Sequence, residues 1–304
     1  MARIVHGNHP FDVPKDQPMR IGREQVGYFT YPDMEYLASS DLNVLYISTD
    51  KLTLGYFELS PGAQFSPPDH HPGDECYFVL EGELTEVNCY SGQACAVKPG
   101  ESLLIPYGAA HGGYNFTDKK MKAVFALAPN MVKPGDQKFP TDLEGKWRVL
   151  NGEQEGEYEK YPAYEQKRIL GSIDLLGNWP VKDEEHRKEP KYLRVAHEAD
   201  KLSIINGYDN PYLMKFAFST KYINFGEIVL PVGGKGCRIS DPESHKGQTA
   251  LYVKSGCLSV IITETRETFK LYPDEVIYIP ENCEYQMMNY EAEPVELIFA
   301  ISEL

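Results

Sequence analysis

Two short stretches decide how this chain folds: GAQFSPPDHHPGDECYFVLEG at residues 62–82 and GESLLIPYGAAHGGYN at residues 100–115. In the first stretch, His71 and Glu75 flank a turn that enters an apolar, strand-like run. Side chains along a strand alternate between its faces, so this even spacing sends both residues to one side. In the second stretch, His111 follows the turn at residues 106–108 and comes from a separate strand. Two imidazoles and a carboxylate that converge between strands suit a divalent transition metal ion.

Short strand-like runs surround these two stretches, and Gly, Pro and Asp turns separate them. No long helical period interrupts the pattern, which is typical of an all-β sandwich or barrel. The runs, read along the chain, are residues 43–48, 52–59, 76–87, 94–97, 102–106 and 121–128.

The same pattern returns near the C-terminus, which indicates an internal duplication. Five landmarks recur at one constant offset in numbering: His71 and His245, Gly82 and Gly256, Pro106 and Pro280, Asn115 and Asn289, and Phe125 and Phe299. Upstream the offset is smaller, as between Gly55 and Gly226, which predicts a short insertion in the loop near residues 231–236. The sequence therefore predicts an N-terminal arm at 1–40, a first domain at 41–130, a mostly irregular linker at 131–200 and a second domain at 201–304.

Both stretches resemble the paired motifs of the cupin family. His71, the three-residue gap to Glu75 and the six-residue gap to Gly82 fit the first motif, while Gly100, Pro106, Gly108, His111 and Asn115 fit the second. The resemblance covers residues 43–128 well and 212–304 more loosely. It implies an all-β fold of two tandem jelly-roll β-barrels, with one divalent ion (Fe, Mn, Ni, Zn or Cu) held by His71, Glu75 and His111.

The first barrel departs from the motif at one ligand position, where Asp69 replaces a histidine. Asp69 is either a fourth oxygen ligand or a neighbour of a three-residue site, and we place the fourth ligand there. In the second barrel Glu75 is replaced by Thr249 and His111 by Tyr285. Because two ligand positions are lost, we expect one metal ion per chain, in the first barrel.

Composition narrows the class of partner. The chain has 304 residues, 42% of them hydrophobic, and a net charge of −15, which argues against nucleic acid as a partner because a phosphate backbone requires a basic surface. It has no apolar run long enough for a membrane span and no signal-peptide pattern, so we expect a cytoplasmic protein. Its six cysteines include no CxxC pair, which favours reduced thiols. Because such barrels present broad sheet faces, we expect a homodimer or larger homo-oligomer.

Fold alone does not choose the reaction. The single-site layout favours a dioxygenase-type oxidoreductase acting on a small organic molecule, with Glu75 as a metal ligand that also acts as a base. The alternatives are a metal-dependent isomerase or lyase on a carbonyl or sugar-like substrate, and a non-catalytic binding protein. Strand alternation and closeness to the motifs select five candidate substrate-binding residues: Tyr46, Phe57, Gln64, Tyr77 and Tyr107.

Overall fold

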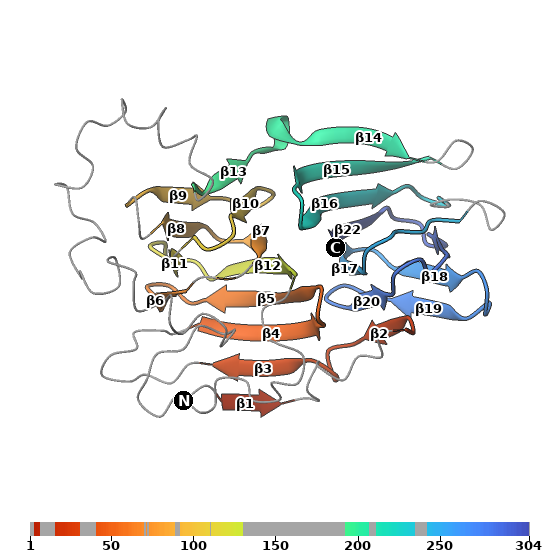
Figure 1. The fold of residues 1–304 in the computed structure, drawn as a ribbon, viewed down its shortest axis with the longest axis horizontal. Helices are drawn as coiled ribbons and strands as arrows, with labels where there is room; N and C mark the ends of the chain where they lie inside the picture. The colour runs from red at the N-terminus through yellow and green to blue at the C-terminus, as the bar shows by residue number, and fades with distance from the viewer. Residues whose placement is uncertain are drawn as a thin grey trace.

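Two β-barrels lie side by side and account for nearly all of the described chain (Figure 1). The structure is a computed structural model, and it describes residues 3–6, 16–30, 41–69, 71, 73–88, 92–109, 111–129, 192–206, 211–234 and 242–303. Within these residues the helical structure is confined to one 3₁₀ turn, η3 (Glu198–Asp200). No helix of this part of the chain has the length and apolar character needed to cross a membrane.

The first barrel is built from two antiparallel sheets. The larger has the strand order β1-β3-β4-β5-β12-β7-β10-β13, and the smaller has the order β6-β11-β8-β9. The strands are β1 (Arg3–His6), β3 (Gly27–Thr30), β4 (Asp41–Ser48), β5 (Thr53–Leu59), β6 (Gln64–Asp69), β7 (Asp74–Glu81), β8 (Leu84–Asn88), β9 (Ala94–Val97), β10 (Ser102–Ile105), β11 (His111–Tyr114), β12 (Met121–Ala128) and β13 (Arg194–Ala196).

The second barrel repeats this arrangement with the orders β14-β15-β16-β22-β17-β20-β2 and β19-β18-β21. Its strands are β2 (Met19–Ile21), β14 (Leu202–Asn206), β15 (Tyr212–Ser219), β16 (Ile223–Leu230), β17 (Thr249–Ser255), β18 (Leu258–Ile262), β19 (Thr268–Leu271), β20 (Val276–Ile279), β21 (Tyr285–Met288) and β22 (Val295–Ser302). Strands β18 to β22 follow β8 to β12 at the same offset as the sequence landmarks, while β15 follows β4 at the smaller upstream offset. The all-β double-barrel fold expected from the sequence is therefore confirmed.

Each barrel borrows an edge strand from the other half of the chain. β2 pairs with β20 of the second barrel, while β13 pairs with β10 of the first (Figure 1). The Arg20 guanidinium on β2 also donates a 3.0 Å hydrogen bond from Nε to Glu275. The segment predicted as an arm therefore supplies strands to both barrels. Residues 130–191, most of the predicted linker, lie outside the described residues, so the predicted domain limits stay predictions.

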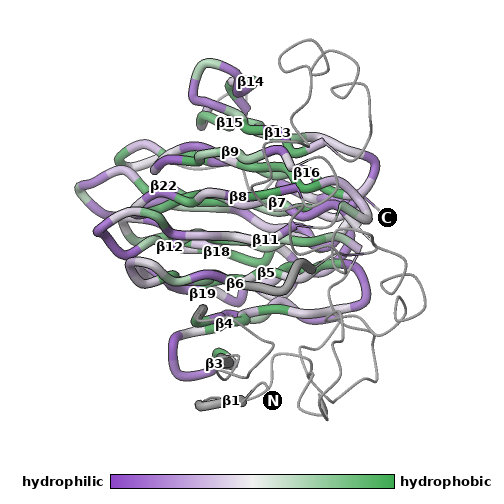
Figure 2. The backbone as a smooth tube through the Cα atoms, turned by 90° about the vertical axis from the view of Figure 1, so that its left-hand side faces the viewer, coloured by the Kyte–Doolittle hydropathy of each residue, from purple (hydrophilic) through white to green (hydrophobic). Residues whose placement is uncertain are grey.

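Apolar residues form three cores, one inside each barrel and one between them. The turns carry most of the hydrophilic residues, and the apolar ones run along the strands (Figure 2). The core between the barrels joins the outer faces of the two large sheets and includes Tyr46, Phe78, Phe225 and Tyr252. Each large sheet therefore packs one face against the interior of its own barrel and the other face against the neighbouring barrel.

In two turns of the second barrel, residues other than glycine adopt the backbone conformation of the motif glycines. Gly100 and Gly108 have φ of 86° and 68°, and their equivalents in the repeat, Asp274 and Asn282, have φ of 65° and 57°. Asp and Asn are the residues that enter this left-handed region most readily after glycine. The turn from Asn282 also keeps its contact, because its N–H donates to the His245 carbonyl as Gly108 N–H donates to that of His71.

Candidate functional site

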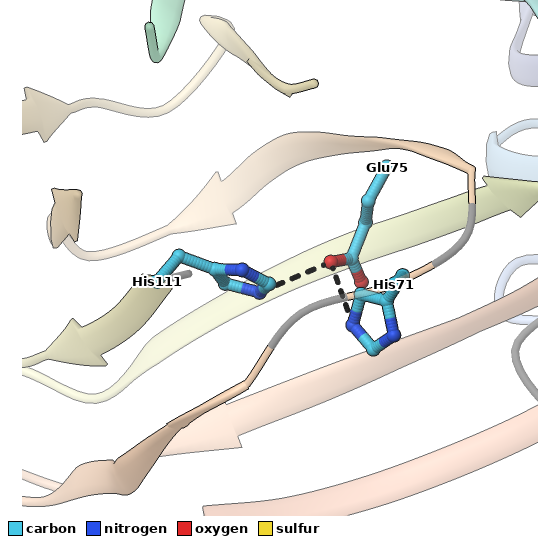
Figure 3. Close-up of side chains that lie close together, drawn as sticks. All are labelled: His71, Glu75 and His111. Carbon is cyan, nitrogen blue, oxygen red and sulfur yellow. Dashed lines mark ion pairs between the residues drawn. The ribbon is translucent and has the colours of Figure 1, made fainter. Parts of the chain in front are cut away.

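Three side chains from three places in the chain converge inside the first barrel (Figure 3). His71 follows β6, Glu75 is the second residue of β7, and His111 opens β11. All three are buried, and their potential ligand atoms lie within 4.8 Å of one another. The Nε2 atoms of His71 and His111 each lie 3.2 Å from Oε2 of Glu75. Among the described residues, this is the group whose donor atoms could hold a metal ion.

The hydrogen bonds around the group hold the donor atoms in place. His111 Nδ1 lies 2.9 Å from the Ala109 carbonyl oxygen, which accepts a hydrogen bond from the ring and leaves Nε2 directed at Glu75. A second ring nitrogen bound to a backbone carbonyl is a frequent device for orienting a metal-binding histidine. Two imidazole nitrogens and one carboxylate oxygen form a donor set that fits a first-row transition metal.

Glu75 is held as a carboxylate. Burial by itself would raise the pKa of Glu75, but the charges and hydrogen bonds of His71 and His111 outweigh it and lower the pKa to about 2. A group with this pKa is a weak base near neutral pH, because an efficient general base has a pKa close to the working pH. Glu75 is therefore in the anionic form that binds a metal ion, and its further role as a base stays a prediction.

The other sequence-predicted residues lie in different surroundings. Phe57 and Tyr77 belong to the core inside the first barrel, with ring centroids 5.0 Å apart. Gln64 is half-buried on β6 opposite Tyr114. The backbone of Asp69 pairs with that of His111, but its side chain lies outside the described residues, so its role as a ligand stays a prediction.

Tyr46 and Tyr107 do not face the barrel interior. Tyr46 packs edge-on against Tyr252 of the second barrel and donates a hydrogen bond to the Asp274 carbonyl. Tyr107 is 46% exposed and stacks on Tyr222. The strand around Tyr46 is buried on both faces, so alternation of side chains does not reveal which face lines the barrel. Both residues lie at the junction of the barrels and outside the interior core of the first barrel, and their role in substrate binding stays a prediction.

Sequence reasoning missed two residues near the group. Phe65 on β6 packs its ring edge-to-face with His111, with centroids 6.1 Å apart. Glu86 on β8 is fully buried, and burial raises its pKa to about 8, with the nearby charge of His111 lowering it and that of Glu75 raising it. The internal repeat could have identified Glu86. The equivalent residue of the second barrel is the apolar Val260, which indicates that this position faces a barrel interior.

The second barrel holds a different set of polar residues at the equivalent place. Glu243 accepts hydrogen bonds of 2.8 Å from both Asn206 Nδ2 and Tyr212 Oη, and His245 lies 3.2 Å from the Tyr285 hydroxyl. These side chains are hydrogen-bond partners of one another. At the positions equivalent to His71, Glu75 and His111 the second barrel keeps one imidazole, that of His245. These residues of the second barrel form no metal-holding group among the described residues.

Comparison with known proteins agrees with this architecture. The sequence profile of the Cupin domain family matches residues 55–127, which span β5 to β12 and include all three residues of the group. No curated protein sequence matches the chain.

Several solved structures share the fold at low sequence identity. The putative glyoxylate induced protein of Pseudomonas aeruginosa superposes with a TM-score of 0.56 at 14% identity, over 99% of this chain and 95% of that one. Oxalate decarboxylase of Lactobacillus farciminis, solved as a formate complex, gives 0.56 at 13% identity over 97% and 87%. AerE of Microcystis aeruginosa gives 0.54 at 12% identity over 90% and 98%. Residues 55–127 therefore match the Cupin domain family, and the chain as a whole shares the double-barrel fold of these solved structures.

Proposed function

We propose that this protein is a metal-dependent enzyme that acts on a small organic molecule, with its centre in the first barrel. The observation that carries the proposal is the buried group of His71, Glu75 and His111, whose donor atoms face one another beside the apolar core of the first barrel. Placing an anionic carboxylate there costs desolvation energy, and a bound cation offsets that cost. One divalent ion per chain is the stoichiometry that this arrangement supports.

Each residue of the group has a role that follows from its contacts. His71 and Glu75 would bind the ion from the two ends of one turn, and His111, oriented by the Ala109 carbonyl, would bind it from the facing sheet. The ion would supply a Lewis acid and, if it is iron or copper, reactivity towards O2. Phe57, Phe65 and Tyr77 would keep bulk water away from the bound molecule, because they fill the adjacent interior.

Within this class we propose a dioxygenase-type oxidoreductase, with a metal-dependent isomerase or lyase as the alternative. The one group among the described residues that could hold a metal ion supports a centre that works without a second metal ion. The four described cysteines, Cys76, Cys95, Cys257 and Cys283, are free thiols, which fits the proposed cytoplasmic location.

A matched pair of variants tests the proposal. His111→Ala should empty the site, because two remaining ligands hold an ion poorly, and should leave the far-ultraviolet circular dichroism spectrum unchanged. Tyr285→Ala, at the equivalent position of the second barrel, should keep one metal ion per chain. Elemental analysis of untagged protein measures both. Full metal occupancy in His111→Ala, or two tightly bound ions in the wild type, would refute the assignment. Iron or copper with O2 uptake supports the oxidoreductase, and zinc or manganese without O2 uptake supports the isomerase or lyase.

A further inference from the structure

Glu86 is a buried carboxyl group in the first barrel that lies outside the three-residue group. It is 0% exposed, and neither of its carboxyl oxygens has a hydrogen-bond partner among the described residues. A buried polar group without a partner lowers the stability of a fold, because it has lost its bonds to water and gained none. Such a residue calls for a role other than packing.

Strand register places Glu86 on the same side of its sheet as the metal-holding group. β8 pairs antiparallel with β11, and in this register Asn88 is opposite His111 and Glu86 is opposite Gly113. Residues directly opposite each other project to the same face, and alternate residues along a strand share a face. The Glu86 side chain therefore enters the interior beside His111, on the β8–β11 side of the group.

Electrostatics supports this placement. The charges of His111 and Glu75 both act on Glu86, the first lowering and the second raising its pKa, while burial is the largest cause and brings the pKa to about 8. In the metal-free protein the group therefore carries its proton at neutral pH, and a protonated carboxyl group donates a hydrogen bond.

The internal repeat shows that the barrel itself does not need a carboxyl group here. The residue equivalent to Glu86 is Val260, and the residue equivalent to Asn88 is Ile262, both of which belong to the interior core of the second barrel. The barrel that lacks Glu75 and His111 equivalents therefore has apolar residues at these positions of its β18 strand. The polar pair of β8 occurs in the barrel that carries the metal-holding group.

We propose that Glu86 is a ligand-binding residue of the first barrel, donating a hydrogen bond to an oxygen of a small carboxylate-bearing molecule held at the metal. This inference rests on the proposed function and names its substrate class. When Asp69 lies beside the site without binding the ion, a divalent ion held by His71, Glu75 and His111 leaves one net positive charge in the interior. An anionic ligand balances that charge, and a protonated carboxyl group beside it stabilises the second oxygen of the anion.

The experiment uses protein loaded with Co²⁺, whose visible absorption reports on what binds the ion, and acetate and glycolate as probes. Glu86→Val copies the second barrel and so should fold, while Glu86→Gln keeps a hydrogen-bond donor. Wild type should show saturable spectral changes with at least one probe. Glu86→Val should bind that probe about tenfold more weakly or worse. Glu86→Gln should stay within a few-fold of wild type. All three proteins should bind Co²⁺ with similar affinity.

Three results would overturn the inference. The first is unchanged probe affinity in Glu86→Val, and the second is no saturable response of the wild type to either probe. The third is loss of Co²⁺ affinity in Glu86→Val, which would make Glu86 a metal ligand instead. A wild-type protein that takes up no Co²⁺ refutes the proposed function itself, and the ligand role of Glu86 with it. Unfolding of the metal-free proteins gives a separate reading: Glu86→Val should raise the melting temperature, and a fall would show that Glu86 supports the fold.

Discussion

The buried carboxyl of Glu86 should make the stability of the metal-free protein fall as pH rises. Burial raises the pKa of Glu86 from 4.5 to about 8. Between these two values the folded chain binds a proton that the unfolded chain has released. Unfolding is therefore favoured by rising pH, and the contribution of Glu86 is fully present below pH 4.5 and lost as pH rises towards 8.

The size of the effect follows from the same two values. One pKa unit corresponds to about 1.4 kcal/mol, so two pH units inside this window change the free energy of unfolding by about 3 kcal/mol. The whole window amounts to about 5 kcal/mol as an upper figure, since a buried glutamate with a pKa of 8 to 9 is at the high end of what proteins show. Glu75 does not interfere, because its pKa of about 2 places its own transition below this range.

The measurement is urea unfolding of metal-free wild type and Glu86→Val, followed by circular dichroism between pH 5 and pH 7. Groups that do not interact with Glu86 contribute equally to both proteins and cancel in the difference, whereas the contribution of His111 belongs to the Glu86 effect because the two charges interact. The stability advantage of Glu86→Val should grow by about 3 kcal/mol from pH 5 to pH 7. Glu86→Gln should also lose this part of the pH dependence, because an amide does not titrate in this range. A difference that stays constant across this range would refute the reasoning, since it would mean that Glu86 titrates alike in the folded and unfolded chains.

Two further predictions concern how the barrels are joined and how chains associate. Asp274→Asn keeps a residue that tolerates the left-handed turn but removes the charge that accepts hydrogen bonds from Lys122 Nζ, at 2.8 Å, and from Tyr252. Because Lys122 is then left buried without its carboxylate partner, the protein should lose about 3 kcal/mol of stability by urea unfolding, and an unchanged midpoint would contradict this. Sedimentation at micromolar concentration should show a homodimer or larger, because β14 forms an outer strand of its sheet among the described residues and exposes Leu202 and Ile205. Ile205→Lys should shift that equilibrium towards monomer, whereas a wild type that sediments as a strict monomer would refute the prediction.

The sequence by itself determined the duplicated all-β fold and three residues, His71, Glu75 and His111, that the structure brings together in a group that could hold a metal ion. Both depend on local information: the spacing of His71 and Glu75 across one turn, the turn before His111, and a repeat whose offset reappears in strands β18 to β22. Alternation along a strand and turn chemistry act over a few residues, so they can be read from the chain without knowing its partners.

Only the tertiary structure decided which faces are interior and which strands are neighbours. Tyr46 lies in the core between the barrels. Its strand is buried on both faces, so apolar residues alternate with apolar residues and the sequence does not show which of them face the barrel interior. The exchange of β2 and β13 between barrels joins residues far apart in the chain, and nothing local specifies such a pairing. The position of Glu86 was also not predictable from the local sequence, because a glutamate in an alternating strand normally faces water. The pairing of β8 with β11 places this glutamate in the interior, beside His111.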